Sequence, residues 1–110
     1  MRQSPPLNLV VLILPEGIAL KTASGHVAPG CREVGRGVTV PRVDGKLDLP
    51  SLVACARALK AQKPSFAQET LVTLTESPAL PVGELFDVAI ALAGTKEEPL
   101  FPKVQFGLAR

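Results

Sequence analysis

The sequence contains no Trp and no Tyr, and only four Phe among its 110 residues. Proteins that stack nucleic-acid bases or sugar rings use aromatic side chains, so neither a single-stranded nucleic-acid platform nor a sugar-stacking groove is expected. The net charge is only +2, and the Lys and Arg residues are scattered along the chain. We therefore expect no nucleic-acid partner, because phosphate binding needs a concentrated basic surface.

Long apolar runs are also missing. The most apolar stretch, LNLVVLIL (Leu7 to Leu14), is much shorter than the roughly 20 residues of a membrane-spanning helix, and Pro15-Glu16-Gly17 ends it. A secretory signal would need a basic start and a small-residue cleavage site, and LPEGIAL is no such site. Short length and β-branched residues favour a buried strand, so the chain as given is predicted to be soluble.

Residues with catalytic potential are scarce. His26 is the single histidine and lies in the Gly- and Pro-rich segment 23–37, which predicts a solvated loop residue. A pairing of His26 with Cys31 is conceivable by proximity, but nothing orients it for nucleophilic catalysis. No phosphate-binding loop and no metal-ligand spacing occurs. We therefore predict no catalytic residue, no cofactor and no metal site, and a chain that is not an enzyme.

The two cysteines, Cys31 and Cys55, are 24 residues apart. This spacing fits neither a CxxC redox motif nor a zinc site. Two buried thiols in a cytosolic protein and one structural disulfide in an oxidising compartment are both compatible with it. The spacing alone leaves these alternatives open.

Hydrophobic periodicity and turn residues predict seven elements. The expected strands are 7–14, the part of 15–22 after the turn, 38–43, 69–76 and 103–109, and the expected helices are 49–63 and 81–93. The segment 23–37 is expected to be a long loop. Pro41 indicates an edge position for its strand, because proline cannot donate to a sheet ladder.

The helix ends carry recognisable signals. Asp48 is a plausible N-cap for the first helix, and Pro50 is tolerated in its first turn. The apolar stripe of this helix predicts that Lys60, with the other basic residues, faces outward. Pro81 suits the start of the second helix, and Gly94 is typical of the residue that follows a helix.

The predicted order is therefore β-β-β-α-β-α-β in one domain, residues 1–110. Helices that cover one face of a sheet give a two-layer α/β (α+β) sandwich. We expect a mixed sheet of about five strands, with two helices on one face.

The second half, ETLVTLTESPALPVGELFDVAIALAG followed by LFPKVQFGLAR, resembles the C-terminal half of the ExbD/TolR family. In that family a strand ending in a small residue and an acid is followed by a turn, a helix, a glycine and a terminal strand. Thr75-Glu76, Pro81-Val82 and Gly94 occupy the corresponding positions, although the family's usual aspartate and tyrosine are replaced. LVVLILPEGIALKTASGHV resembles the family's first strand pair, and the loop 23–37 is an insertion relative to short members.

The resemblance implies a periplasmic domain of a proton-motive-force-driven motor subunit. The family's transmembrane helix carries the protonatable aspartate and would lie upstream of residue 1, contacting an ExbB/TolQ-like membrane subunit. The implied partners are a second copy in a homodimer and a TonB/TolA-like transducer or peptidoglycan. A periplasmic location would favour a disulfide between Cys31 and Cys55.

The terminal strand is the predicted dimer element, since an unpaired strand edge is a template for a second copy. Its interface candidates are Val104, Phe106 and Leu108, which fall on one side of the strand. An ordinary strand inside the monomer is compatible with the same pattern. The alternative function is a cytosolic small-ligand-binding regulatory domain, which predicts free thiols and a defined pocket.

Overall fold

A computed structural model describes residues 6–31, 33–77 and 80–107. This part of the chain forms an open mixed sheet with helices in an α+β arrangement, which confirms the predicted fold class. The strands are β1 (Val10–Leu14), β2 (Gly17–Thr22), β3 (Gly25–His26), β4 (Val40–Pro41), β5 (Leu71–Glu76) and β6 (Lys103–Phe106). The helices are α1 (Leu49–Lys60), α2 (Pro64–Ala67) and α3 (Val82–Ala93).

β1 lies at the centre of the sheet. It pairs antiparallel with β2 through the tight turn at Pro15-Glu16 and parallel with β5, and β5 pairs parallel with β6. The order is β3-β2-β1-β5-β6, with β4 also paired to β2. The apolar run at the start of the sequence is therefore a strand, and hydrogen bonds flank it on both sides.

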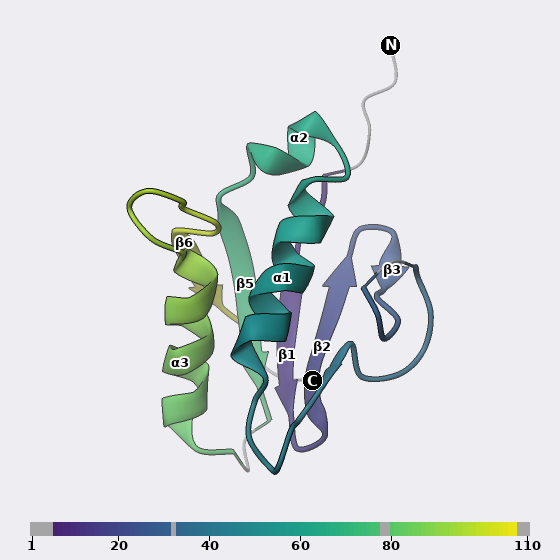
Figure 1. Cartoon of the computed structure of the whole chain (residues 1–110), viewed down its shortest axis with the longest axis vertical. Helices are drawn as coiled ribbons and strands as arrows, with labels where there is room; N and C mark the ends of the chain where they lie inside the picture. Colours follow the sequence, from purple (N-terminus) through teal and green to yellow (C-terminus); the bar gives the residue numbers. More distant parts are fainter. Residues whose placement is uncertain (1–5, 32, 78–79, 108–110) are drawn as a thin grey trace.

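α1 and α3 lie side by side over one face of the sheet, as predicted (Figure 1). Alternate strand residues and the inner helix faces meet in a single core. Its fully buried members include Val11, Ile13, Ile18, Leu20, Leu52, Val72, Leu74, Val88, Leu92 and Phe101. No helix in the described residues combines the length and the apolar character needed to cross a bilayer.

The predicted helix signals are found at both helices. The Asp48 carboxylate accepts a hydrogen bond from the Ser51 backbone N–H at 3.3 Å and caps α1, with Pro50 in the first turn. Gly94 ends α3 with φ of +78°, a conformation that other residues rarely adopt. Pro81 is the N-cap of α3 and not its first helical residue.

The prediction that Lys60 faces outward is wrong. Lys60 is buried at the end of α1, where its ammonium donates to the Leu100 carbonyl and lies 4.6 Å from the centre of the Phe101 ring. Burial lowers the pKa of Lys60, and the charge of Glu69 partly opposes this shift. Helical periodicity could not reveal this contact, because the 100–101 segment comes from a distant part of the chain.

Three predicted boundaries also change. The first helix ends at Lys60, and Pro64 begins the separate short helix α2. The expected loop 23–37 contains β3, and the expected strand 38–43 is reduced to β4 at Val40–Pro41. β6 ends at Phe106, so the Leu108 part of the predicted strand lies outside the described residues.

Candidate functional site

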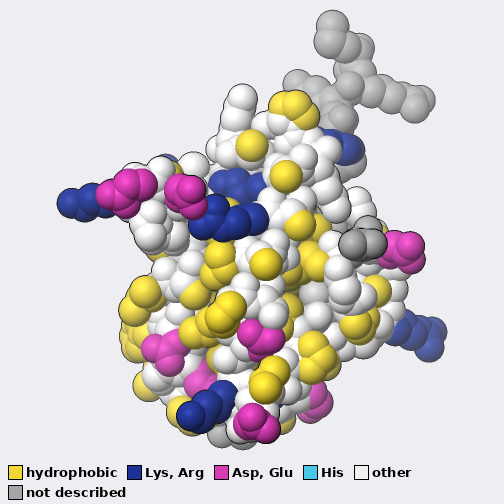
Figure 2. All heavy atoms as spheres, viewed as in Figure 1, with side chains coloured by type: hydrophobic (Ala, Val, Ile, Leu, Met, Phe, Trp, Pro, Cys, Tyr) yellow, Lys and Arg dark blue, Asp and Glu magenta, His cyan; other side chains and the backbone are white. Residues whose placement is uncertain are grey.

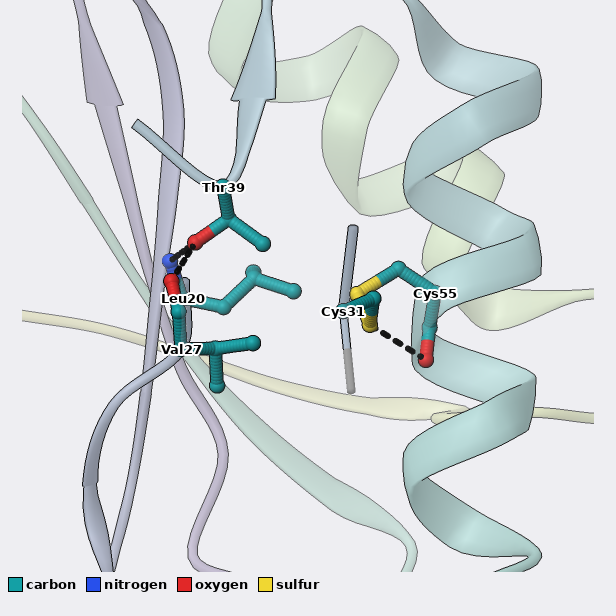
Figure 3. Close-up of a disulfide and its surroundings, with 5 residues drawn as sticks. All are labelled: Leu20, Val27, Cys31, Thr39 and Cys55. Atoms are coloured by element: carbon teal, nitrogen blue, oxygen red, sulfur yellow. Dashed lines mark hydrogen bonds between the residues drawn. A yellow bond between two sulfur atoms is a disulfide. The ribbon is translucent and has the colours of Figure 1, made fainter. Parts of the chain in front are cut away.

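A disulfide joins Cys31 to Cys55, with 5.6 Å between the two Cα atoms. Cys31 lies in the loop after β3 and Cys55 lies on the buried side of α1, so the bond holds this loop against the helix (Figure 3). Cys31 has a left-handed φ of +63°. The alternative of two free thiols, which the sequence left open, does not describe the folded chain.

Thr39 completes the hydrogen bonding beneath the loop that Cys31 anchors. Its hydroxyl accepts from the Leu20 backbone N–H at 3.0 Å and donates to the Val27 carbonyl at 2.6 Å (Figure 3). On this side β2 pairs with β3 and β4 only at its two ends. The Thr39 hydroxyl accepts a hydrogen bond from Leu20, which lies between these two pairings. This role explains why a polar side chain is buried here.

A cleft of about 420 Å³ opens beside the disulfide, between α1, β4 and the Cys31 loop. Both cysteines, Pro41 and Ala54 contribute mostly apolar walls. The polar residues at one end, Asp48 and Ser51, already bond to each other, with 2.6 Å between Oδ2 and Oγ. The cleft could accept a small apolar group, and its free polar groups are few.

A charged cluster lies where β1, β5 and α3 meet. Arg42 makes a two-pronged ion pair with Glu84, with N–O distances of 2.7 and 2.8 Å, and also donates to the Leu14 carbonyl at 3.3 Å. The hydrogen bond from Arg42 lowers the pKa of Glu84, against the opposing effect of burial. Burial raises the pKa of Glu76 at the end of β5, and the Glu84 charge adds to this shift.

The outer edge of β6 is open within the described residues. On the inner side of β6, the Lys103 N–H donates to the Thr70 carbonyl just before β5 at 3.0 Å. The Gly107 N–H donates to the Leu74 carbonyl of β5 at 2.8 Å. Because backbone groups alternate along a strand, the amides of Val104 and Phe106 point to the other, unpaired side. The strand predicted to mediate dimerisation is therefore an edge strand.

Side chains of the predicted dimer residues lie on the helix face of this edge strand. Val104 and Phe106 align with Val72 and Leu74 of β5, which point into the core under α3. Val104 is half-buried, whereas 54% of Phe106 is exposed. The third candidate, Leu108, lies outside the described residues.

Sequence reasoning missed the outward face of α3. Val82, Phe86 and Ile90 are 62%, 54% and 71% exposed, and hydrophobic side chains lie along the margin of the molecule where α3 is found (Figures 1 and 2). The signal was present in the sequence, because Glu84 and Asp87 are the only charged residues of this helix. A helix that is apolar on all sides is normally covered on all sides.

The residues considered for catalysis do not form a site. His26 lies in β3, where it pairs with Lys21 of β2. Cys31 is oxidised and carries no thiolate, which removes the conceivable dyad with His26. Across the described residues, no three His, Cys, Asp or Glu side chains come together in a metal-binding group.

These observations describe a two-layer α+β domain with one disulfide. An apolar margin, made of the exposed Val82, Phe86 and Ile90 of α3 and Phe106 of β6, lies at one edge of its sheet. Comparison of the chain with protein-family models, with curated proteins and with solved structures gave no match.

Proposed function

We propose that this chain is the periplasmic domain of an ExbD/TolR-like subunit of a proton-motive-force-driven inner-membrane motor. An upstream transmembrane helix would anchor it and contact an ExbB/TolQ-like subunit. The domain would couple ion flow to transport, envelope maintenance or motility by forming a homodimer and contacting a TonB/TolA-like transducer or peptidoglycan.

The Cys31–Cys55 disulfide is the observation that carries the proposal. Structural disulfides persist in oxidising compartments such as the periplasm and are rare in the reducing cytosol. The cleft beside this bond favours the alternative, a cytosolic small-ligand-binding regulatory domain. That alternative also requires free thiols, so the disulfide weighs against it.

The order of elements in the second half supports the resemblance. β5 ends at Glu76, α3 follows after a short connection, Gly94 ends that helix, and β6 is the last strand of the described residues. These are the strand, acid, helix, glycine and strand of the family pattern.

The position of β1 suits a domain that is pulled from its N-terminal side. The Glu69 carboxylate accepts from the backbone N–H groups of Leu7 and Asn8 at 2.7 and 3.0 Å, just before β1. β1 is then hydrogen-bonded on both sides, to β2 and β5. A force from an upstream anchor would therefore reach the centre of the sheet directly.

The test is copurification of the full-length gene product in detergent with the multi-span protein encoded beside it. We expect a stable complex that survives deletion of residues 6–110, because the anchor makes the contact. A coding sequence without an apolar segment of about 20 residues before residue 1, or a full-length product that never associates with a membrane, would refute the proposal.

The compartment is tested separately by alkylating the protein in intact cells before and after reduction. We expect two modified cysteines only after reduction, since both thiols are in the disulfide. The Cys55→Ser variant is the control, and its Cys31 should react without reduction. Two reactive thiols in the unreduced wild type would favour the cytosolic alternative.

A further inference from the structure

We infer that the cleft beside the disulfide is a binding site for a small primary alkylamine, with the ammonium group at the Asp48 carboxylate and the alkyl chain along α1. The cleft has a volume of about 420 Å³. Small-molecule sites usually have volumes of about 300–1,000 Å³, so a ligand of this kind has room. This site is independent of the motor function proposed above.

The disulfide gives the cleft a fixed wall. Cys55 belongs to α1 and Cys31 to the loop after β3, so the bond sets the separation of the two sides (Figure 3). Val40 and Pro41 of β4 also line the cleft, and β4 is paired with β2. Walls that are held in this way lose little further freedom when a ligand binds, and this favours affinity.

The α1 wall changes from polar to apolar along the helix. Four residues of α1 line the cleft on one helix face, since residues three and four apart are neighbours: Ser51, Ala54, Cys55 and Ala58. Ser51 lies in the first turn beside Asp48, and a rise of about 1.5 Å per residue places Ala58 about 10 Å further along the axis. The wall therefore suits a linear ligand of about this length, with a polar head at the Asp48 end.

Within the described residues, the polar side chains of the cleft offer hydrogen-bond acceptors and no free hydroxyl proton. The Ser51 hydroxyl donates to Asp48 Oδ2 at 2.6 Å, and the Thr39 hydroxyl donates to the Val27 carbonyl. Each oxygen of the Asp48 carboxylate accepts one hydrogen bond from Ser51, which leaves further lone pairs on both oxygens. The ligand must therefore bring the donors, and the polar atoms of an ammonium group are donors alone.

The charge of the cleft has the sign that an ammonium group needs. Asp48 is the one charged residue that lines it in the described part of the chain, and neither ion pair found there includes this carboxylate. The start of α1 does not offer an anion site instead, because Pro50 has no N–H and the N–H groups of Ser51 and Leu52 donate to Asp48. An amine is therefore favoured over an acid or an alcohol of the same length.

The length of the α1 wall favours a small molecule over the lysine side chain of a partner protein. A lysine has a four-carbon stem, which would cover only part of the distance of about 10 Å between Ser51 and Ala58. An extended octyl chain is about as long as this wall. Octylamine is therefore the probe that matches the cleft.

The inference is tested by titrating the isotope-labelled 110-residue chain with octylamine and following its backbone amide NMR signals. We expect saturable shifts for Ala54, Cys55 and Ala58 on α1 and for Gly30 on the other side of the cleft. Octanol and octanoate are the matched ligands. Each should bind about tenfold more weakly or worse, as expected when a charge-assisted hydrogen bond is lost.

The charge is tested with Asp48→Asn, which keeps a residue that caps helices well and should lower the affinity for octylamine about tenfold or more. Asp44→Asn is the matched control. Asp44 is exposed in the turn before α1, does not line the cleft, and has a φ of +51° that asparagine tolerates. This variant should bind octylamine as the wild type does, and circular dichroism checks that both variants are folded.

The position of the alkyl chain is tested with Ala54→Leu, which fills part of the cleft from the exposed face of α1 and should also weaken octylamine binding about tenfold or more. Ala61→Leu makes the same change at the C-cap of α1, outside the cleft, and should leave the affinity unchanged. Neither alanine is buried, so the core is not overpacked in either variant.

A wild-type chain that shows no saturable shifts with octylamine overturns the inference, as does equal affinity for octanol or octanoate. Asp48→Asn or Ala54→Leu with wild-type affinity would place the amine elsewhere and overturn it as well. N-acetyl-lysinamide presents a lysine side chain, and binding of this probe as tight as that of octylamine would assign the cleft to a partner's lysine instead. Copurification with the multi-span protein can succeed or fail in each case, because it tests the anchor and not the cleft.

Discussion

Single side chains complete hydrogen bonds that the strands of this domain leave unmade. The Thr39 hydroxyl bridges Leu20 and Val27, and the Glu69 carboxylate binds two backbone N–H groups before β1. Each of these side chains forms hydrogen bonds with backbone groups that are far away in the sequence. Replacing Thr39 would leave a buried donor and a buried acceptor unpaired, which costs more than the bonds themselves contribute.

Thr39→Val removes the hydroxyl and keeps the shape of the side chain. We expect a loss of about 2 kcal/mol in the free energy of unfolding, because the Leu20 N–H and the Val27 carbonyl lose their partner. Urea denaturation measures the change. Thr39→Ser keeps the hydroxyl and should lose less than half as much, so an equal loss in both variants would contradict the hydrogen-bond role.

The ion pair between Arg42 and Glu84 predicts a pH dependence. The folded pKa of Glu84 lies below the unfolded value of about 4.5, so its contribution to stability is present above that pH and is lost as the pH falls through the folded pKa. Glu84→Gln should therefore lower stability by about 1.5–3 kcal/mol at pH 7, as for lost hydrogen bonds to a charged group, and should have little effect below the folded pKa of Glu84. Urea denaturation at several pH values measures this.

Glu76→Gln is the control for that experiment, because the pKa of Glu76 is shifted the other way. Its folded pKa lies above about 4.5, so its ionisation costs stability as the pH rises through this range. The amide should leave stability at pH 7 unchanged or raised. A Glu84→Gln variant with the same pH profile as the wild type would refute the assignment of the ion pair.

At the scale of the helices and strands, the two glycines of the α3 region have opposite roles. Gly94 ends α3 with φ of +78°, and a Cβ there would collide with the Glu98 carbonyl and the Leu100 N–H. Gly83 lies within the first turns of α3, and a Cβ there would meet no atom within 4 Å.

Gly94→Ala should destabilise the domain by more than about 1 kcal/mol, because alanine is strained in this conformation and the 98–100 segment must move. Gly83→Ala should stabilise it by about 0.5–1 kcal/mol, since alanine loses less entropy in a helix. Thermal unfolding of both variants gives the comparison. A destabilising Gly83→Ala would show that the start of α3 is not helical in solution.

The disulfide connects a loop to α1 and limits the freedom of the unfolded chain. Replacing both Cys31 and Cys55 with Ser should lower the free energy of unfolding by roughly 3–4 kcal/mol, as expected for a closed loop of this size. Urea denaturation of this variant and of the reduced wild type should give similar values. A loss below about 1 kcal/mol would show that the loop is held by its other contacts.

At the scale of the whole molecule, the sheet formed by the described residues has one edge divided between β3 and β4 and one edge formed by β6. The first edge is short and contains Pro41, which makes it a poor partner for another strand. The second edge carries the apolar margin. Association is therefore expected at the β6 side of the molecule.

Dimerisation at this side predicts that the melting temperature rises with protein concentration, because mass action stabilises the folded state that binds a second copy. The increase should be nearly independent of salt, since the predicted contact is apolar. Differential scanning calorimetry over a hundredfold concentration range measures it. The Phe106→Pro variant lacks an outward N–H of β6 and is expected not to pair with a second copy, so its melting temperature should not depend on concentration.

Local sequence signals predicted the existence and type of the main elements well. LNLVVLIL, the Asp48 cap and the glycine at position 94 each act within a few residues, and each is found where expected. Lys60 and Thr39 were not predictable in this way, because the groups that bury them come from residues 100–101 and from strands β2 and β3. The exposed face of α3 had a local signal, the lack of charge, that was not used.

The amino-acid sequence by itself determined the main strands and helices, because apolar period, caps and turn residues are local properties, but it missed the short elements β3 and α2. It left the state of Cys31 and Cys55 open, since pairing depends on where a loop and a helix meet in space. Only the tertiary structure brought the two cysteines together and made β6 an edge strand. It also placed α3, with its exposed apolar side chains, against that same edge strand, because the contact between α3 and β6 joins separate segments of the chain.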